Sequence, residues 1–599
     1  MTSNSITRRS FLKTASAAAA MTASRPPVAL DPPREVLQQL PYGAVTLTGG
    51  PFKEHYDRIH AHYLSLSNDR LLKVYRQRAG LPSPGPDMGG WYDLNGFVPG
   101  HALGQYISGL ARIGAATGDP ACHAKVRELV AGFAPTLGPD NQSILRPPPH
   151  NPPNLWTCYT LDKHFAGLID AATLSNVSEA RDLLNRVLAG AQPLLPAQGR
   201  DRIGKKDPPY DETFVMPENL FTAAELTGNP VFLELAHRYL LDRELFNPLA
   251  AGDDPFPGQH AYSHVIALSS GAKAYLTLGD TRYQRSLENA FTLLTTTQQF
   301  ASGGWGPNET FITPHRGELY ASLSSTVDHF ETPCGAYAAT KLARYLLRFT
   351  ADPRYGDNLE RVLYNTILAA RFPDSDGDYP YYSTYSPAAK KVFYQKKWPC
   401  CSGTLVQTVA DYVLNLYFQS PDGLFVNLYT PSEVRWTHHG TAITLTQKTA
   451  FPAADRASIA IKPSSPTDFT LTLRIPAWTA QPTLTLNGKP QSVALKPGAT
   501  ASLTRRWTSG DTIELTLPQS FRTESIDDQH LSTAALMRGP VQYVALDPTV
   551  NKTNEVQMPR PSLTRDLKPV APQSYIGGAQ TFIPLYTVQS ETYDTYFNL

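Results

Sequence analysis

The first pattern along the chain is a helical period of apolar residues. Asp119 and Pro120 are typical of a helix start, and from Val126 apolar residues recur at i, i+3, i+4 and i+7. Comparable groups containing Gly, Asn, Asp or Pro return at 227–230, 278–280 and 350–353, with a weaker version at 174–176. Their spacing of about 50 to 70 residues fits a two-helix hairpin with its loops. We predict stacked hairpins that close into an (α/α) barrel; the alternative is an irregular helical domain.

After about residue 411 the pattern changes to alternating, β-branched runs, as in 424–428 and 469–475. Asn487-Gly488 lies between two such runs and is a strong hairpin signal. We therefore predict one or more β-sandwich domains over 421–599, after a helical domain over 31–420. The stretch from about 549 is rich in Pro, Thr and Gln and is interpreted as a long connection or a returning strand. Because acids and histidines are sparse here, chemistry is expected in the helical domain.

The first 30 residues resemble a twin-arginine export signal. Arg8 and Arg9 are followed by Phe11-Leu12 and by a short Ala-rich stretch to about residue 23. A disordered terminus that happens to carry two arginines is the alternative. No later apolar run approaches the roughly 20 residues needed to cross a bilayer. The protein is expected to be periplasmic or secreted, without a membrane span.

The net charge limits the classes of binding partner, and the cysteine content limits the number of disulfides. Lys plus Arg number 53 and Asp plus Glu 52, which leaves no field to attract nucleic acid or an anionic membrane. A neutral partner such as a carbohydrate is favoured. The 5 cysteines are too few for a disulfide scaffold in 599 residues. Cys122 and Cys158 occur in apolar helical surroundings and are interpreted as buried small hydrophobes.

The other three cysteines lie in two short motifs. Cys400 and Cys401 are adjacent and followed by Ser-Gly-Thr, which implies a tight turn that gathers sulfur atoms. Alone, this pair is consistent with a vicinal disulfide, two buried thiols or part of a metal site. The second motif supplies Glu331 and Cys334. Three thiolates and one carboxylate form a donor set that can hold Zn²⁺ in tetrahedral geometry, with zinc–sulfur bonds of about 2.3 Å.

At this point the sequence resembles glycoside hydrolase family 127, the β-L-arabinofuranosidase-like group. The motifs that carry the resemblance are Pro99-Gly100-His101, 159–163, 260–264, 331–334, 360–365 and Cys400-Cys401-x-Gly-Thr. The resemblance covers most of the chain after the signal segment. It implies an (α/α)₆ barrel with β-sandwich domains. It also implies a zinc ion bound by one Glu and three Cys, of which one Cys is the nucleophile, and a second Glu as the acid/base.

Carried over by motif, the zinc ligands are Glu331, Cys334, Cys400 and Cys401, and Cys400 is the nucleophile. This chain departs from the family pattern at one point, because Cys334 follows Glu331 by three positions instead of two. The acid/base maps to Glu309, which ends the Gly-rich loop that starts at Gly303; Glu318 is the competing residue.

Further residues are predicted to line the sugar pocket. His260 and His264 are four apart and would share a helix face, a geometry that suits metal binding or a pair of hydrogen-bonded pocket residues. The resemblance places them near the sugar. His101, Glu360 and Tyr382 are also candidate substrate-binding residues, and a purely structural role is the alternative for each.

The predicted chemistry is a retaining mechanism in which a sulfur replaces one carboxylate. A metal-bound thiolate attacks the anomeric carbon while neutral Glu309 protonates the leaving oxygen, and the same glutamate then activates water. The family implies β-L-arabinofuranose, and the altered Glu–Cys spacing is a reason to expect a related sugar instead. Two alternatives keep a purely structural zinc: a barrel hydrolase or lyase of other specificity, and a non-enzymatic glycan-binding protein.

Overall fold

The computed structural model describes residues 34–145, 156–199, 212–325, 332–546 and 560–599. The predicted twin-arginine segment and the predicted ligand Glu331 lie outside the described residues. Residues 35–599 form one unit of the structure. Within the described residues no helix combines the length and apolarity that crossing a bilayer requires.

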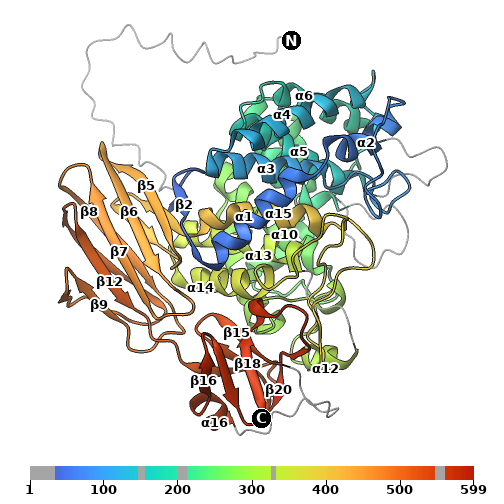
Figure 1. The fold of residues 1–599 in the computed structure, drawn as a ribbon. Coiled ribbons are helices and arrows are strands. Elements are labelled where there is room, and N and C mark those ends of the chain that lie inside the picture. The colour runs from blue at the N-terminus through green and yellow to red at the C-terminus, as the bar shows by residue number, and fades with distance from the viewer. Residues whose placement is uncertain (1–33, 146–155, 200–211, 326–331, 547–559) are drawn as a thin grey trace, which may run out of the picture. The chain divides into compact units, whose positions relative to one another are not determined.

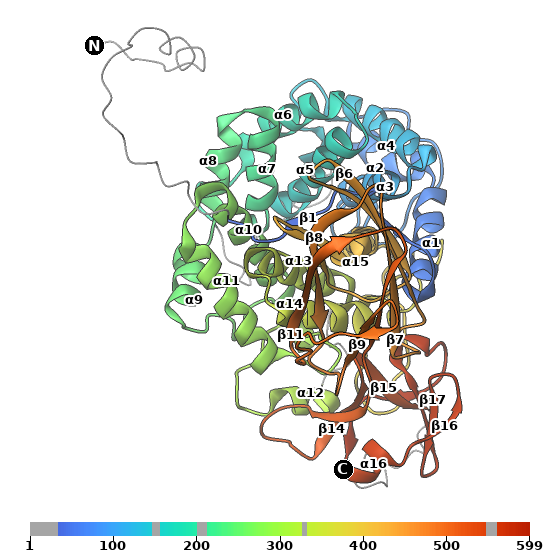
Figure 2. The same ribbon diagram turned by 90° about the vertical axis from the view of Figure 1, so that its left-hand side faces the viewer.

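Helices from successive hairpins form a closed inner ring. Each inner helix contacts the next, and the last contacts the first, which closes the ring (Figures 1 and 2). Nearly every side of these helices is buried, as expected for helices surrounded by protein. In ring order they are α3 (Leu103–Thr117), α5 (Thr157–Leu174), α7 (Pro217–Thr227), α10 (Ala261–Leu278), α13 (Thr332–Thr350) and α15 (Cys401–Ala410).

Amphipathic helices cover the ring from outside. Five of them follow their inner partner in sequence: α4 (Pro120–Phe133), α6 (Glu179–Ala191), α8 (Pro230–Tyr239), α11 (Thr281–Leu293) and α14 (Pro353–Val362). The partner of α15 comes from the start of the chain and is α1 (Gly50–Ser65). Shorter helices at the periphery are α2 (Asn68–Arg78), α9 (Asn247–Ala251), α12 (Glu318–Ser325) and α16 (Arg560–Arg565). The predicted (α/α)₆ barrel is confirmed.

The recurrent Gly, Asp and Pro groups are the turns from inner to outer helices. Gly118 ends α3 in the left-handed conformation, with φ of 75°, and Asp119 then caps α4 by accepting the N–H of Ala121 at 2.8 Å. A left-handed residue followed by a capping oxygen reverses the chain in very few residues. The same arrangement recurs in other hairpins, where Asn229, Asp280 and Asp352 are the caps.

Two sheets form the β-sandwich. The first has the strand order β1 (Gln38–Gln39), β3 (Tyr417–Ser420), β4 (Gly423–Val426), β8 (Thr467–Ile475), β11 (Ala499–Trp507). The second has the order β10 (Lys489–Pro490), β9 (Thr483–Leu486), β12 (Asp511–Thr516), β7 (Arg456–Pro463), β6 (Thr441–Thr449), β5 (Ser432–His438), β2 (Val45–Leu47). Trp436 of the second sheet packs edge-on against Phe469 of the first, with ring centroids 5.6 Å apart. Asn487 and Gly488 form the predicted hairpin turn between β9 and β10.

A third sheet contains the C-terminal strands. Its order is β13 (Phe521–Ser525), β14 (Thr533–Arg538), β15 (Val541–Leu546), β18 (Gln580–Pro584), β17 (Ser574–Gly577), β16 (Lys568–Ala571), with β19 (Tyr593–Asp594) on β15 and β20 (Phe597–Asn598) on β14. Figure 1 shows this sheet in red and the sandwich in orange. The end of the chain therefore pairs with strands that come earlier in the sequence, as one of the two interpretations of this stretch predicts.

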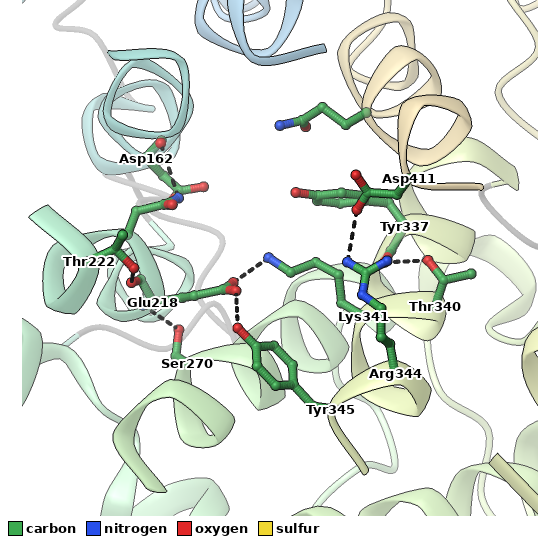
Figure 3. A network of polar contacts seen from close by, with 12 residues as sticks. Asp162, Glu218, Thr222, Ser270, Tyr337, Thr340, Lys341, Arg344, Tyr345 and Asp411 are labelled. Carbon is green, nitrogen blue, oxygen red and sulfur yellow. Dashed lines mark hydrogen bonds and ion pairs between the residues drawn. The ribbon is translucent and has the colours of Figure 1, made fainter. Parts of the chain in front are cut away.

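A polar network joins the inner helices α7 and α13. Glu218 of α7 accepts hydrogen bonds from the Lys341 ammonium and from the Tyr345 hydroxyl, the latter at 2.8 Å (Figure 3). Both charged side chains are largely buried, with 14% and 12% of their surface exposed. Removing one partner of a buried pair leaves the other charge uncompensated. We expect Glu218→Gln to lower the free energy of unfolding by about 3–5 kcal/mol in urea denaturation.

Glu225→Gln is the matched control, because Glu225 lies on the same helix and pairs with Lys273 at 2.7 Å but is 52% exposed. That change should cost less than about 1 kcal/mol. Burial raises the pKa of Glu218, but the Lys341 charge and the hydrogen bonds from Lys341 and Tyr345 act together in the opposite direction, and the pKa lies below its usual value. The stabilisation is then complete above the unfolded pKa of about 4.3 and is lost as the pH falls through the lower folded value. A constant difference between the wild type and Glu218→Gln down to pH 3 would contradict this assignment.

Candidate active site

A cavity of about 210 Å³ lies where the inner helices begin. Val98, Trp156, His260 and Cys400 line it, and each precedes an inner helix by a few residues at most. Because several helix N-termini converge there, their dipoles favour negative charge in the cavity. Most of the wall is aromatic: Trp91, Phe97, Trp156, Tyr159, Tyr262, Tyr381, Tyr382 and Tyr394. Ring faces with polar edges suit a sugar, which offers C–H groups and hydroxyls together.

The sulfur atoms of Cys334, Cys400 and Cys401 form a buried triangle beside this cavity. Sγ of Cys334 is 3.4 Å from that of Cys400 and 3.3 Å from that of Cys401, and the remaining side is 4.0 Å. A tetrahedral ion with zinc–sulfur bonds of about 2.3 Å needs sulfurs about 3.8 Å apart. The triangle therefore fits three corners of a zinc site, and the predicted fourth ligand, Glu331, lies outside the described residues.

The Cys-Cys-x-Gly-Thr motif produces this triangle by close helix packing. Cys400 is the N-cap residue of α15, and Cys401 starts the helix. A Cβ on Gly403 would lie 2.1 Å from the side-chain oxygen of Gln105 on α3 and 2.9 Å from its Cβ, so a larger residue would displace Gln105 or push α15 away from α3. The Thr404 hydroxyl is 3.1 Å from the sulfur of Cys334. Gly403 and Thr404 thus place two cysteines of α15 against the one on α13.

The three sulfurs differ in access. Cys400 lines the cavity and is 4% exposed, whereas Cys334 and Cys401 are fully buried. Burial raises the pKa of the Cys401 thiol, and hydrogen bonds to the two neighbouring sulfurs raise it further. Three thiolates therefore need a cation to share this space. Of the three cysteines, Cys400 is the one that borders the cavity.

A buried lysine lies near the sulfur triangle. The Lys163 ammonium is 3.3 Å from the ring centre of Tyr159, a cation–π contact in the cavity wall. Burial lowers the pKa of Lys163, and the negative charges of Asp162, Cys334 and Cys400 act in the opposite direction. Its position offsets part of the negative charge that three thiolates would bring.

Glu309 lines the same cavity as Cys400. It lies in a tight turn in which both Asn308 and Glu309 have left-handed φ angles, 53° and 59°. Such a conformation is rare for a residue with a side chain and is typical of functional sites. The Tyr381 hydroxyl donates a hydrogen bond to Oε1 of Glu309 at 2.6 Å, which orients the carboxyl group. The competing residue Glu318 accepts the N–H of Thr313 and lines a different cavity.

Of the three predicted pocket histidines, His260 lines the cavity, whereas His101 and His264 lie behind the cavity wall. Nδ1 of His260 is 3.3 Å from the Glu212 carboxylate. His264 is one turn further along, donates a hydrogen bond from Nδ1 to the backbone oxygen of His260 and packs on Phe214. His101 is fully buried and contacts Trp91, with ring centroids 6.1 Å apart. Burial and the Lys163 charge lower the pKa of His101 to about 4.

Glu360 is placed away from the cavity, which does not support its predicted role in substrate binding. Its Oε2 is 3.1 Å from the Arg474 guanidinium and accepts the Trp478 indole N–H at 2.9 Å. Glu360 and Arg474 are essentially unexposed. Burial raises the pKa of Glu360, and Arg474 counteracts it. Through these contacts Glu360 joins α14 of the barrel to the β-sandwich. Tyr382, in contrast, lines the cavity.

Several cavity residues carry no signal that the sequence analysis used. Glu212 is 1% exposed and brings a second carboxylate into the wall, but it belongs to no motif. Trp91, Phe97 and Tyr394 lie in long loops where the chain shows neither helical nor alternating periodicity. Their nearness to glycine-rich turns, such as Gly89-Gly90 before Trp91, is the one local feature that could have marked them.

Comparisons with known proteins identify the family of the chain and relatives with the same fold. The family model described as the β-L-arabinofuranosidase GH127 catalytic domain matches residues 44–413, and the GH127 middle-domain model matches residues 423–519. A GH127 β-L-arabinofuranosidase from Geobacillus stearothermophilus T6 has a similar structure, with a TM-score of 0.72 and 18% identity over 92% of this chain and 99% of that one. The GH127 β-arabinofuranosidase BT3674 gives a TM-score of 0.75 and 17% identity over 94% and 98%. A search of curated proteins finds no match.

Proposed function

Because this chain belongs to glycoside hydrolase family 127, we propose that it is a zinc-dependent retaining enzyme that releases β-L-arabinofuranose or a closely related sugar. The observation that carries the proposal is that Cys400, one corner of the sulfur triangle, and Glu309 line one cavity. A nucleophile and an acid/base on opposite sides of one sugar are what a retaining glycosidase needs. An arrangement for glycan binding alone would need neither a thiol nor a strained carboxylate there.

The cavity volume supports action at a chain end. About 210 Å³ accommodates one monosaccharide ring, and aromatic side chains surround that space. A site that holds one ring releases single sugars, whereas cleavage within a polymer needs an open cleft on both sides of the bond. We therefore infer exo action, with the sugar to be released at the bottom of the cavity.

In the first step the Cys400 sulfur attacks the anomeric carbon. A carbon–sulfur bond forms, the glycosidic carbon–oxygen bond breaks, and protonated Glu309 transfers its proton to the leaving oxygen. In the second step Glu309 removes a proton from water, the water oxygen bonds to the anomeric carbon, and the thiolate leaves. Two inversions at one carbon retain its configuration. The Tyr381 hydroxyl holds the Glu309 carboxyl in place during both transfers.

The residues that would hold zinc are Cys334, Cys400, Cys401 and Glu331. Bound zinc supplies the positive charge that keeps the cysteine sulfur deprotonated at neutral pH. Lys163 adds a second positive charge near Cys334 and Cys400. Glu212 and His260 are within reach of one another and offer polar groups to sugar hydroxyls.

A panel of aryl glycosides tests the function directly. We expect the highest kcat/KM on β-L-arabinofuranosides, in comparison with α-L-arabinofuranosides, xylosides and galactosides. NMR of the first-formed product should show the β anomer, which is the retained configuration. A first-formed α anomer would exclude a glycosyl-enzyme intermediate, and activity confined to another sugar would move the substrate assignment while leaving the mechanism intact.

Phe97 provides a platform for the leaving group. It is 54% exposed at the cavity wall and packs against Trp91 and Trp156, with ring centroids 4.7 and 5.7 Å apart. An exposed ring held by two others suits stacking of the sugar beyond the cleaved bond. Phe97→Ala should lower kcat/KM on a disaccharide by about 3–10-fold, the worth of one aromatic contact.

The same variant should act normally on the corresponding glycosyl fluoride, because fluoride is too small to touch Phe97. Tyr320→Ala is the control, since Tyr320 is also an exposed ring but stacks on His530, away from this cavity. Equal losses on both substrates would mean that Phe97 supports the cavity itself instead of the leaving group.

A further inference from the structure

A second group of metal-binding side chains lies on the outer helices. His60 of α1 points at Asp119, the N-cap residue of α4, with Nε2 3.0 Å from Oδ2. The same nitrogen is 3.2 Å from the sulfur of Cys122 in the first turn of α4, and that sulfur is 3.9 Å from Oδ2. Three different donor atoms therefore converge on one point.

The donor types and spacing fit zinc. Imidazole nitrogen, thiolate sulfur and carboxylate oxygen are its usual ligands, whereas calcium and magnesium avoid thiolates. Tetrahedral zinc would hold such atoms about 3.4 to 3.6 Å apart, close to the observed spread. A Cys–His–Asp catalytic triad does not fit, because a triad uses both ring nitrogens of the histidine and here one nitrogen faces both partners.

A neighbouring hydroxyl supports a ligand at this point. Tyr56 precedes His60 by one turn of α1, is 4% exposed, and its hydroxyl has no hydrogen-bond partner among the described residues. Burial raises the pKa of Tyr56, and the negative charge of Cys122 raises it further. A water molecule on a metal ion would give the buried hydroxyl its partner.

We propose that His60, Asp119 and Cys122 bind a second zinc ion, which fastens α1 to the start of α4. This site, called the clamp below, consists of His60, Asp119 and Cys122 and joins two outer helices next to the point where the helical ring closes. α1 is the outer helix of α15 and α4 is the outer helix of α3, and α15 and α3 meet where the helical ring closes. His60 and Asp119 retain 19% and 25% exposure, so the ion reaches the site from solvent. This zinc is independent of the one proposed beside Cys400.

Zinc analysis after equilibrium dialysis of the full chain against excess zinc tests the clamp. We expect 2 zinc ions per chain in the wild type, 1 from this site and 1 from the sulfur triangle. Cys122→Ala should bind one fewer, keep its glycosidase activity, and show a smaller zinc-induced rise in melting temperature than the wild type. His60→Ala should behave in the same way, and its partly exposed side chain makes it the variant least prone to misfolding.

Cys158→Ala is the matched control, since Cys158 is also a buried cysteine but belongs to no group of possible ligands among the described residues. It should keep the wild-type zinc content. Cys401→Ser separates this proposal from the proposed function, because it should lose the zinc of the sulfur triangle and keep the clamp zinc. Wild-type zinc content in Cys122→Ala and His60→Ala would overturn the proposal, leaving a hydrogen-bonded trio of side chains.

Discussion

Glu309→Gln is expected to slow the hydrolysis of glycosides with poor leaving groups by about 10²–10⁴-fold, the usual contribution of a general acid. The glutamine has nearly the same shape and can still accept the Tyr381 hydroxyl that now bonds Oε1 of Glu309. It cannot supply a proton to the leaving oxygen or take one from water. Because Glu309 does not belong to the sulfur triangle, zinc content should stay unchanged.

A substrate with a good leaving group separates the two steps. The acidic phenol of an activated aryl glycoside leaves without being protonated. The variant should therefore form the glycosyl-enzyme and then stall. Mass spectrometry of the stalled protein should find one sugar on the peptide that contains Cys400. A sugar on an aspartate or glutamate peptide would reject the thiolate mechanism.

Glu318→Gln is the control for this experiment. Glu318 lines a different cavity and receives the Thr313 N–H, so the change should leave turnover nearly unaltered. Near-normal turnover of Glu309→Gln on poor leaving groups, together with a large loss in Glu318→Gln, would transfer the acid/base role to Glu318. Loss in both variants would indicate damage to the loop between them.

The barrel could be predicted from the sequence because its signals are local. A left-handed turn residue, a capping side chain and an apolar helical period all act within one hairpin, as at Gly118 and Asp119. The same local signals do not separate a closed ring from an irregular helical domain, since closure depends on the contact between α15 and α3 at opposite ends of the helical domain. Strands β1 and β2 are two and three residues long, too short for any periodicity. Their place in the sandwich sheets is set by pairing with β3 and β5.

The site was predictable where motif and geometry coincide. Cys400 and Cys401 could be grouped from the sequence because the Ser-Gly-Thr that follows them implies a tight turn. Cys334 was added because its motif completes a donor set that can hold zinc, and because the family resemblance includes it. Glu360 was assigned to the pocket because it belongs to a recognisable motif. Its motif is equally explained by a buried ion pair with Arg474, and a sequence does not distinguish a residue kept for packing from one kept for binding.

Apart from Tyr382, the aromatic wall is the part of the site that the sequence analysis did not find. Trp91, Phe97 and Trp156 belong to loops, and their rings form a row only because the inner helices begin side by side. No spacing along the chain encodes that row. Side chains brought together by tertiary structure, as here and at His60 and Cys122, become visible only in three dimensions.

Removing zinc from the sulfur triangle should abolish activity, and Cys401→Ser should do the same without touching the nucleophile. Cys401 is fully buried and does not line the cavity, so it has no contact with sugar. Its sulfur is 3.3 Å from that of Cys334, and its loss removes one of the proposed ligands. We expect at least about a 10²-fold fall in kcat with loss of zinc, because the serine hydroxyl is a poorer zinc ligand than the thiolate it replaces.

Cys158→Ala, which removes a buried thiol outside the triangle, should retain both zinc and turnover. Chelation of the wild type should reproduce the Cys401→Ser defect, and added zinc should restore the wild type alone. Full turnover in chelated protein whose zinc is undetectable would show that Cys400 works as an ordinary thiol, and the zinc part of the proposed function would then be wrong.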